Sequence, residues 1–452
     1  MFSRVLVANR GEIAVRVIRA LHELGIEAVA IYSTADRDAL HVELADQAIC
    51  VGPPSATDSY LHVSNVVAAA ETTGCEAVHP GYGFLAENPA FVRACEDEGL
   101  VFIGPPAEVM ERMGDKVRAK EAMREAGVPL VPGSNGAATL EEVRRAALET
   151  GLPVLLKAAA GGGGKGMRLV LAEEELEGAY TAARAEAEAA VGDGSIYLER
   201  ALTPARHVEI QVLCDTQGGV LTLGERECSI QRRHQKLVEE SPSAALDPAT
   251  REAMESAVER ACGAIGYRNA GTFEFLLGPE GGFHFIEVNC RLQVEHPVTE
   301  LVTGIDIVRE QIRLAAGEPL RVTGRAPRSG HAIEVRINAE DPARGFAPAP
   351  GRVTRFRPPL GPGVRVDTAM LEGRDVQPYY DSLVAKVIVW DDSRAAAIDR
   401  ARRALAELEV EGIATTRELA LDVLDAPEFR RGEYSTSTLA ELAGRLPSLA
   451  RA

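Results

Sequence analysis

Residues 272–296 read TFEFLLGPEGGFHFIEVNCRLQVEH, and this stretch decides how the middle of the chain folds. Its alternating runs at 273–277 and 283–289 flank the turn signal GPEGG at 278–282, a pattern that predicts a β-hairpin. A four-residue loop with Gly278 opposite Phe283 sets a register in which Glu274 lies opposite Glu287. Facing carboxylates repel each other, so we expect a cation between them.

The polar residues that follow continue the same face of the second strand. At a period of two, this face carries Glu287, Asn289, Arg291, Gln293 and Glu295. A row of carboxylate, amide and guanidinium groups suits an oxygen-rich metal site or a bound anion. The alternative is a solvated polar face, which is normal for half-buried strands.

Length and charge narrow the class of protein. A chain of 452 residues can bury several cores, and its length suggests about three domains. The formal net charge of -18 argues against a nucleic-acid surface, although a local basic cleft for phosphates stays compatible with it. The sequence has no long apolar run and no signal-peptide pattern, so we expect a soluble, cytoplasmic protein. Its seven cysteines lack CxxC spacing and indicate neither a zinc site nor a disulfide framework.

Lysine is rare in this chain. Six of the 49 basic residues are lysines, so arginine serves almost everywhere that a surface charge suffices. Where lysine occurs, we expect a site that needs a compact point charge, with chance retention at the surface as the alternative. The six are Lys116, Lys120, Lys157, Lys165, Lys236 and Lys386.

Residues 1–113 form the first predicted domain. Apolar runs at 4–8 and 27–32 enclose a helical pattern at 13–24, which predicts a βαβ unit and a doubly wound parallel sheet. The loop NRGE at 9–12 lacks the repeated glycines of a dinucleotide site, and a structural role is favoured there. The loop HPGYGF at 79–84 follows a predicted strand at 76–78, at a strand end where α/β sites usually lie.

Residues 114–324 form the second predicted domain, with a lid at about 132–202. Strands at 152–156 and 168–171 enclose the run AAAGGGGKGM. No helix follows the glycines, and Lys165 precedes Gly166 instead of Ser or Thr, so the Rossmann and P-loop interpretations fail. A mobile hairpin that folds over phosphates is favoured over a flexible linker.

Further predictions concern the rest of the second domain and the third domain. Strands are expected at 196–198 and 205–211. Residues 225–236, ERECSIQRRHQK, are so rich in charge that we do not expect a buried strand, and a solvated loop is the alternative. The third domain, 325–445, is predicted to be α+β, with an alternating strand near 330–340 and a closing helix at about 394–409.

Several strings together resemble the biotin carboxylase family, the ATP-grasp component of acetyl-CoA and related acyl-CoA carboxylases. They are ANRGEIAVRVIR, HPGYGFLAEN, KAAAGGGGKGM, ERECSIQRRHQK, RLQVEHPVTE, GHAIEVRINAEDP and YYDSL. HPGYGFLAEN, QRRHQK and QVEHPVTE are specific, whereas GGGG is shared with other ATP-grasp ligases. The resemblance spans essentially the whole chain; Cys290 and Ala205 depart from the usual residues without removing a ligand.

The resemblance implies an enzyme that uses MgATP to activate bicarbonate as carboxyphosphate and then carboxylates N1′ of biotin. It implies that Mg²⁺ or Mn²⁺ is held by Glu274 and Glu287, with Asn289 assisting. For ATP, it implies phosphate contacts from Lys116 and Lys157 and from the loop that contains Gly163, Gly164 and Gly166. The remaining implied ATP contacts are Glu199, Leu202 and His207 on the adenosine side, and Gln231 and His234 near the phosphates and ribose.

The resemblance also assigns the carboxylation chemistry. Arg291 and Lys236 would bind bicarbonate, Glu295 would be the general base, and Gln293 with the main chain of Val294 would complete the pocket. Arg336 would stabilise the negative ureido oxygen of biotin. Tyr82 would line the biotin side.

Partners follow from the same resemblance. Lys386 lies inside an apolar strand pattern, and little sequence follows the last helical segment, so we expect no attached biotin and no fused carrier. A biotin carboxyl carrier and a carboxyltransferase would act in trans, and a homodimer is expected by analogy. The alternatives are a pyruvate or other non-CoA carboxylase component, another ATP-grasp ligase of the carboxylate-amine or carbamoyl phosphate synthetase type, and a regulatory pseudoenzyme.

Overall fold

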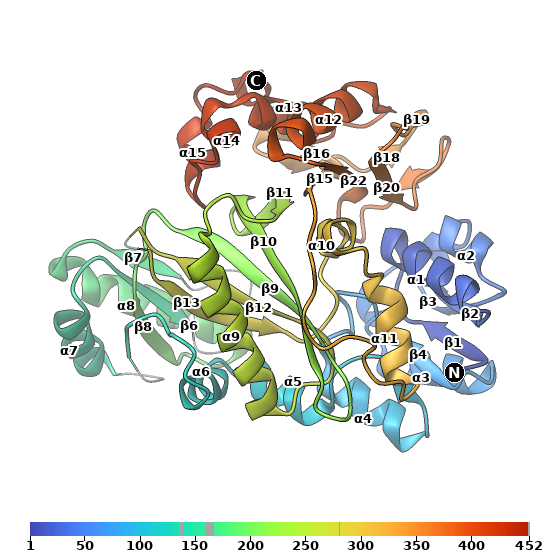
Figure 1. Cartoon of the computed structure of the whole chain (residues 1–452), viewed down its shortest axis with the longest axis horizontal. Helices are drawn as coiled ribbons and strands as arrows, with labels where there is room; N and C mark the ends of the chain where they lie inside the picture. Colours follow the sequence, from blue (N-terminus) through green and yellow to red (C-terminus); the bar gives the residue numbers. More distant parts are fainter. Residues whose placement is uncertain (135–138, 159–166, 280, 451–452) are drawn as a thin grey trace.

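The computed structural model describes residues 1–134, 139–158, 167–279 and 281–450. Figure 1 shows the N-terminal sheet in blue, the segment predicted as a lid in teal, projecting to one side, a long central sheet in green and yellow, and the C-terminal part in orange and red above it. The predicted mixed α/β fold with a parallel N-terminal sheet is confirmed.

The N-terminal part is a parallel sheet with the strand order β3-β2-β1-β4-β5 in the described chain. Helix α1 forms because Ile13, Val17 and Leu21 recur at helical spacing and are all buried. The predicted loop at 79–84 follows β4 directly. The elements are β1 Arg4–Val7, α1 Gly11–Glu23, β2 Glu27–Ser33, α2 Leu40–Leu44, β3 Gln47–Gly52, α3 Val63–Thr72, β4 Ala77–His79, α4 Pro89–Asp97, β5 Val101–Phe102, α5 Ala107–Gly114 and α6 Lys116–Glu125.

The predicted lid contains a small antiparallel sheet, β7-β6-β8 within the described residues, with helices α7 and α8. The β6–β7 pairing confirms the two strands that were predicted on either side of the glycine run. The glycine loop between these strands, which includes the predicted residues Gly163, Gly164 and Gly166, lies outside the described residues. The elements are α7 Leu140–Thr150, β6 Val154–Ala158, β7 Arg168–Val170, α8 Leu176–Val191 and β8 Ile196–Arg200.

The central sheet runs in the order β13-β12-β9-β10-β11-β15-β22-β20, with β14 beside β10. Its β11–β15 pairing joins strands on either side of the domain boundary predicted at 324–325. The strands are β9 Arg206–Cys214, β10 Val220–Arg232, β11 Gln235–Ser241, β12 Asn269–Leu277, β13 Phe283–Asn289, β14 Gly324–Arg325, β15 His331–Asn338, β20 Val364–Thr368 and β22 Leu383–Asp391.

Helices cover this sheet and place the site. Helix α9, Pro248–Ile265, begins where the Asp247 side chain accepts a hydrogen bond from the Thr250 amide, and it ends at Gly266 in the left-handed conformation. Helix α10, His296–Thr303, packs against β15, β22 and β11, and α11, Ile307–Ala315, follows it. The loop at 290–295 is thereby held between β13 and α10.

The C-terminal part ends in helices that the sequence prediction missed. The predicted helix at 394–409 is α12, Arg394–Glu407, but it does not close the chain, because α13 Arg417–Asp425, α14 Pro427–Arg431, α15 Thr438–Leu442 and α16 Pro447–Ala450 follow. The remaining short strands are β16 Glu340–Asp341, β17 Ala347–Pro348, β18 Gly351–Arg352, β19 Arg355–Arg357, β21 Asp375–Val376 and β23 Glu409–Glu411.

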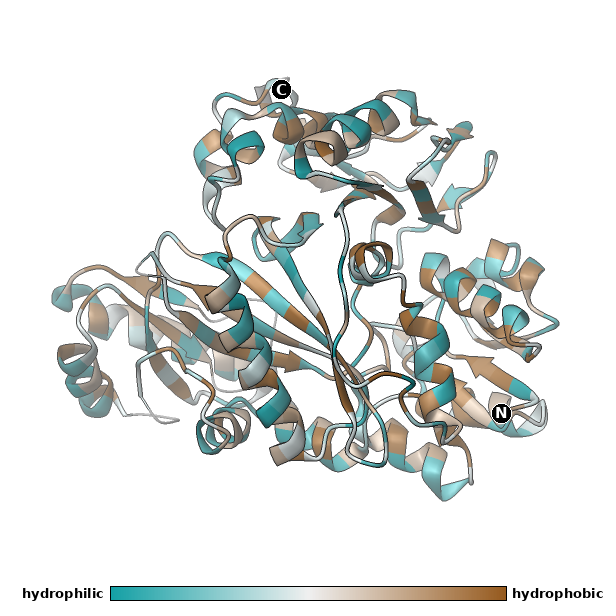
Figure 2. Ribbon diagram, in the orientation of Figure 1, coloured by the Kyte–Doolittle hydropathy of each residue, from teal (hydrophilic) through white to brown (hydrophobic). Residues whose placement is uncertain are grey.

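The hydrophobic core is continuous across the first two parts. Leu6 and Val29 of the N-terminal sheet belong to the same buried cluster as Val208 and Phe273 of the central sheet. Figure 2 shows helices that are brown on some faces and teal on others, as amphipathic packing requires. Among the described residues, the helices are too short or too polar to cross a membrane.

Candidate active site

The Glu274–Glu287 pairing is confirmed, but the hairpin reaches it by a different register. Leu277, not Gly278, pairs with Phe283, and an irregularity between Glu274 and Phe275 shifts the ladder by one residue. This bulge returns Glu274 to a position directly opposite Glu287. Two carboxylates therefore lie on directly paired positions of β12 and β13.

Glu274 is surrounded by four donors from outside its own strand. Lys236 Nζ lies 3.0 Å from its Oε1, and His207 Nε2 lies 2.8 Å from its Oε2. Asn289 Nδ2 and Gln293 Nε2 donate to the same Oε1 at 2.9 and 3.0 Å. Burial raises the pKa of Glu274, but the charges of Lys236 and His207 outweigh burial and hold its pKa well below the ordinary value.

Glu287 is the less compensated member of the pair. It makes no ion pair within the part of the chain that the structure describes, and the surrounding protein together with the charge of Glu274 raises its pKa. A divalent cation with a preference for oxygen ligands would offset both carboxylates. Asn289 lies beside Glu274, but its Nδ2 donates to Glu274 and its Oδ1 accepts from Arg291, so the two glutamates are the oxygen donors that face each other here. The donor set fits Mg²⁺.

The row of polar residues after Glu287 converges, although the predicted strand is wrong beyond Asn289. Strand β13 ends at Asn289, residues 290–295 are irregular, and α10 begins at His296. The Arg291 guanidinium joins the row, because Nη2 donates to Asn289 Oδ1 at 2.9 Å and Nη1 donates to Gln293 Oε1 at 2.7 Å. Side-chain hydrogen bonds, not strand periodicity, bring these groups together.

Glu87 was missed by the sequence analysis and anchors this loop. Its carboxylate lies 2.9 Å from Arg291 Nε and accepts the Cys290 amide at 2.8 Å. Glu87 belongs to the HPGYGFLAEN string, so the signal was present, but its partners are about two hundred residues away in sequence.

Glu295 is held between two cations. Lys236 Nζ lies 2.6 Å from its Oε1, and Arg336 Nη2 lies 2.8 Å from its Oε2. Burial raises the pKa of Glu295, but the charges of Lys236 and Arg336 outweigh burial, and the pKa lies well below the ordinary value. The Glu295 carboxylate is therefore ionised at neutral pH. Arg336 is fixed in turn by Glu239, whose Oε1 lies 2.6 Å from Arg336 Nε.

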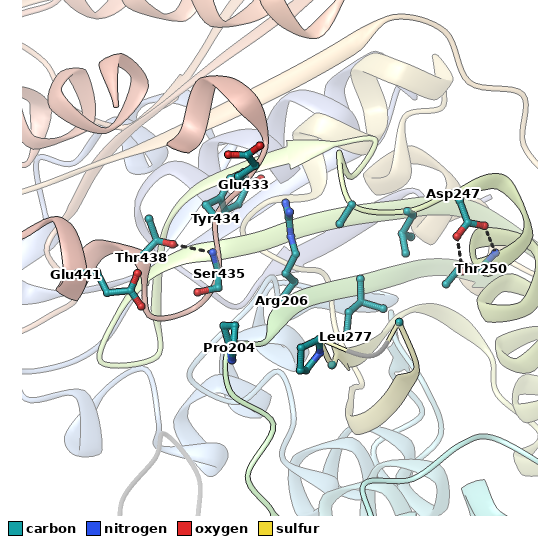
Figure 3. Close-up of a pocket in the computed structure, with 15 residues that line it drawn as sticks. Pro204, Arg206, Asp247, Thr250, Leu277, Glu433, Tyr434, Ser435, Thr438 and Glu441 are labelled. Carbon is teal, nitrogen blue, oxygen red and sulfur yellow. Dashed lines mark hydrogen bonds between the residues drawn. The ribbon is translucent and has the colours of Figure 1, made fainter. Parts of the chain in front are cut away.

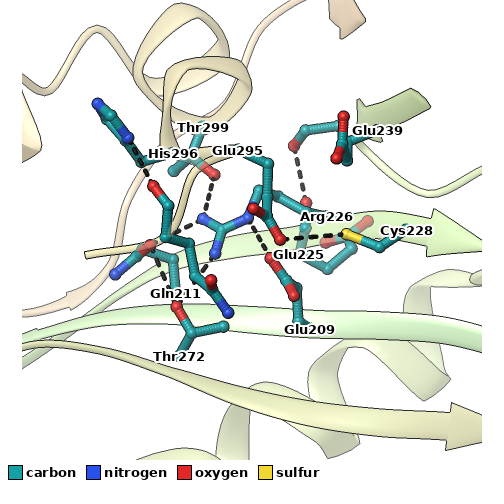
Figure 4. A network of polar contacts seen from close by, with 12 residues as sticks. Glu209, Gln211, Glu225, Arg226, Cys228, Glu239, Thr272, Glu295, His296 and Thr299 are labelled. Carbon is teal, nitrogen blue, oxygen red and sulfur yellow. Dashed lines mark hydrogen bonds and ion pairs between the residues drawn. The ribbon is translucent and has the colours of Figure 1, made fainter. Parts of the chain in front are cut away.

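The prediction that residues 225–236 are not a buried strand is wrong. Strand β10 spans Val220–Arg232, and Glu225, Arg226 and Glu227 are each at most 1% exposed. Charges can be buried there because each has partners: Arg226 alone contacts Glu209, Gln211, Thr272 and Thr299 at 2.6–3.1 Å, as Figure 4 shows.

This network leads to the candidate site. Arg226 fixes one oxygen of Glu209, and the other oxygen of Glu209 lies 2.6 Å from Lys236 Nζ. Cys228, on the same strand, approaches Glu295 with Sγ 3.8 Å from Oε1. Residues of β10 thus hold Lys236 through Glu209 and contact Glu295 directly.

Three lysines gather near Glu199, at the base of the lid. Lys157 of β6 and Lys120 of α6 each form an ion pair with Glu199, and Lys120 also lies 4.0 Å from the centre of the Tyr197 ring. Lys116 begins the same helix, and desolvation lowers its pKa. Lys120 was not among the predicted site residues, although its rarity in an arginine-rich chain was the available signal. The cluster suits polyanionic phosphates.

The other predicted residues lie on β10, in the segments that follow β8 and β10, and in the loop after β4. Gln231 is buried near the end of β10, and His234 follows in the tight turn to β11, where burial lowers its pKa. Leu202 is half-buried between β8 and β9. Tyr82 donates to Glu12 and faces Arg336, Lys236 and Arg291 across a cavity of about 600 Å³ between the N-terminal and C-terminal parts.

A second cavity, of about 500 Å³, opens on the opposite face of the central sheet. Arg206 and Leu277 line it (Figure 3). Their neighbours His207 and Leu276 belong to the other face, because side chains alternate along paired strands. Tyr434, Ser435 and Thr438 close it from the C-terminal helices. This cavity is separate from the acid and amide cluster around Glu274.

Comparisons with known proteins match nearly the whole length of the chain. The family model "Biotin carboxylase, N-terminal domain" matches residues 1–110, "Carbamoyl-phosphate synthase L chain, ATP binding domain" matches 115–323, and "Biotin carboxylase C-terminal domain" matches 334–441. The biotin carboxylase of Nostoc sp. is 51% identical over 443 residues, which cover 98% of this chain and 99% of that protein.

A second relative has a solved structure. The small subunit of 2-oxoglutarate carboxylase from Hydrogenobacter thermophilus is 52% identical over 443 residues, covering 98% of this chain and 94% of that protein. The crystal structure of its biotin carboxylase domain dimer with MgADP, ADP and bicarbonate has a TM-score of 0.93 at 52% identity and covers 98% of both chains. The chain therefore belongs to the biotin carboxylase family of ATP-grasp ligases.

Proposed function

We propose that the protein carboxylates biotin on a separate carrier, using MgATP and bicarbonate through a carboxyphosphate intermediate, as the first half-reaction of an acetyl-CoA or other acyl-CoA carboxylase. The observation that carries this proposal is the pair of ion contacts by which Glu295 joins Lys236 and Arg336, at 2.6 and 2.8 Å. A base, a cation for an anionic intermediate and a cation for an oxyanion then meet at one point.

Glu274, Glu287 and Asn289 would hold the metal ion. A Mg²⁺ ion held there would neutralise part of the charge on the nucleotide phosphates. The solved relative binds MgADP, which supports this assignment. Lys116, Lys157 and the residues of the glycine loop Gly163, Gly164 and Gly166 would contact the phosphates, with Glu199, Leu202, His207, Gln231 and His234 around the rest of the nucleotide.

The first step is phosphoryl transfer to bicarbonate. Arg291 binds the anion, Gln293 and the main chain of Val294 complete the pocket, and Glu295 removes its proton. The bicarbonate oxygen then attacks the γ-phosphorus, the bond to ADP breaks, and Lys236 neutralises the carboxyphosphate that forms. A substrate anion that draws Lys236 away from Glu295 would also raise the pKa of Glu295 towards that of a useful base.

The second step transfers the carboxyl group. Carboxyphosphate separates into CO₂ and phosphate, and the phosphate takes the proton from N1′ of biotin. Negative charge then moves to the ureido oxygen, where Arg336 stabilises it, and N1′ attacks CO₂. Tyr82 would line the biotin side of the cavity.

ATP turnover tests the proposal against its rivals. ADP release by the purified chain should require bicarbonate and should rise when free biotin is added. A ligase for another acceptor would ignore biotin, and a pseudoenzyme would release no ADP under either condition. Either result would overturn the proposal.

The final acceptor is set by the carboxyltransferase. Relatives include proteins named biotin carboxylase and a 2-oxoglutarate carboxylase subunit, so sequence similarity does not choose between them. Copurification from the native source should recover an acyl-CoA carboxyltransferase. Recovery of a pyruvate or 2-oxoglutarate carboxyltransferase would replace that assignment and leave the biotin half-reaction in place.

A further inference from the structure

Lys386 lies in the middle of β22 and is fully buried, at 0% exposure. It is the only lysine after residue 236 in a chain that otherwise uses arginine. A buried ammonium is costly unless it is paired and hydrogen-bonded, so its contacts should account for its presence.

The Lys386 ammonium reaches two segments that border the candidate active site. Its Nζ donates to the main-chain oxygen of Val294 at 2.9 Å and lies 3.0 Å from Oε1 of Glu12. Asp367, its neighbour across the sheet, is 3.9 Å away. Burial lowers the pKa of Lys386, but Glu12, Glu334 and Asp367 raise it above the ordinary value.

Both contacts lead to groups with proposed roles in catalysis. The Val294 oxygen belongs to the peptide that joins Val294 to Glu295, so the bond from Lys386 fixes the backbone that carries the proposed base. Glu12 accepts a hydrogen bond from the Tyr82 hydroxyl, so the same ammonium also fixes the wall of the biotin cavity. Arg336 is the residue directly opposite Lys386 in the β15–β22 pairing.

We propose that Lys386 is a positioning residue. It fixes the loop 290–295, which carries the proposed bicarbonate-binding residues, relative to Tyr82, which would line the biotin side of the cavity. It touches neither substrate and acts through the Val294 peptide and through Glu12. This inference rests on the proposed function. Lysine suits the position because three donors on one compact nitrogen can serve contacts in different directions, which the planar fork of arginine cannot do in the same space.

The test uses Lys386→Met, which keeps the length of the side chain and removes its charge and donors. We expect the KM for bicarbonate and the KM for free biotin each to rise by up to about 10²-fold, the scale on which a misplacement of about 1 Å lowers activity. The KM for ATP should stay within about twofold, because Lys386 does not contact the nucleotide lysines. A loss of stability alone would move all three constants or none.

Glu12→Gln separates the two arms and serves if Lys386→Met does not fold. It leaves the bond from Lys386 to Val294, so the KM for biotin should rise while the KM for bicarbonate stays unchanged. Glu240→Gln is the matched control: it removes a buried carboxylate that pairs with His331 and Arg394, away from the cavity. It should lower the unfolding midpoint without changing either KM.

Failure of the inference and failure of the proposed function give different results. A wild-type chain without bicarbonate-dependent and biotin-dependent ATP turnover would remove both. An active wild type with an unchanged bicarbonate KM in folded Lys386→Met would overturn only the role of Lys386. A rise in the bicarbonate KM of Glu12→Gln equal to its rise for biotin would overturn the division into two arms.

Discussion

At the scale of single residues, the position and the charge of Glu295 depend on its ion pairs with Lys236 and Arg336. Glu295→Gln keeps the shape of the side chain but removes the basic oxygen, so we expect turnover to fall by roughly 10²–10⁴, the usual range for loss of a general base. ATP binding should remain nearly intact, since Lys116 and Lys157 are untouched. Steady-state ADP release and nucleotide titration measure the two quantities.

The control for this variant is Glu111→Gln, which removes a carboxylate from an exposed pair with Arg93. It should turn over ATP at the wild-type rate. Unchanged turnover in Glu295→Gln would take the role of base away from Glu295.

Arg336 should separate the two half-reactions. Arg336→Ala is expected to keep bicarbonate-dependent ATP cleavage, while the barrier to biotin carboxylation rises by about 2.7–4 kcal/mol, the scale for loss of one oxyanion donor. Parallel assays of ADP release and of carboxybiotin formation measure the split, with Arg93→Ala as the exposed-arginine control. Equal loss of both activities would place Arg336 elsewhere in the mechanism.

At the scale of elements, the β12–β13 hairpin brings two carboxylates together. Glu287→Gln removes the less compensated of the two, so the Mg²⁺ concentration for half-maximal activity should rise, while Glu274 keeps its ligand role. The measurement is an Mg²⁺ titration at saturating ATP. A titration that does not move would show that the facing carboxylates do not bind the metal.

The same hairpin shows what a sequence can and cannot predict about an element. Alternation and the glycine turn were enough for the two strands and for the Glu274–Glu287 pairing. The bulge that restores this pairing was not predictable, because a bulge leaves the alternation pattern readable in either register. The prediction for residues 225–236 was wrong for a different reason. Arg226 can be buried because it contacts Glu209, Thr272 and Thr299, and only the fold brings these residues near it.

Glu240 joins two strands of the central sheet to helix α12. His331 Nε2 and Arg394 Nε lie 2.6 and 2.7 Å from its Oε2. Burial raises the pKa of Glu240, but these partners lower it from 4.5 to about 2. Because the folded pKa lies below the unfolded value, this carboxylate contributes stability above pH 4.5 and loses the contribution as the pH falls towards 2.

Glu240→Gln should therefore destabilise the chain at neutral pH, by about 3–5 kcal/mol as for other broken buried pairs. The difference in the free energy of unfolding between wild type and variant should narrow as the pH falls from 7 to about 3.5, because the wild type loses the contribution of the Glu240 charge over that range. Denaturant unfolding at several pH values measures this difference. A difference that stays constant with pH would show that the Glu240 charge does not stabilise the fold.

At the scale of the whole molecule, the site is assembled from parts that the sequence could only place one by one. The resemblance indicated the family over the full chain, and the comparisons confirm it. The contact of Glu87 with Arg291 and the contacts of Lys386 with Val294 and Glu12 were not predictable, since these partners lie in other parts of the chain. One continuous sheet runs from β13 to β20, so its strands lie on both sides of the boundary predicted at 324–325. The alternation pattern of single strands does not show which strands share a sheet.

The last prediction follows from the placement of the lysines in the whole molecule. A biotinyl domain presents its lysine on an exposed turn, whereas Lys386 is fully buried in β22 and Lys236 lies among three carboxylates. Biotin should therefore arrive on a partner and enter the cavity beside Tyr82. We expect no streptavidin signal from the purified chain, slow carboxylation of free biotin, and much faster carboxylation of a biotinylated carrier, because a docked carrier raises the local concentration of biotin. Unbiotinylated carrier is the control, and a biotinylated band at the mass of this chain would contradict the prediction.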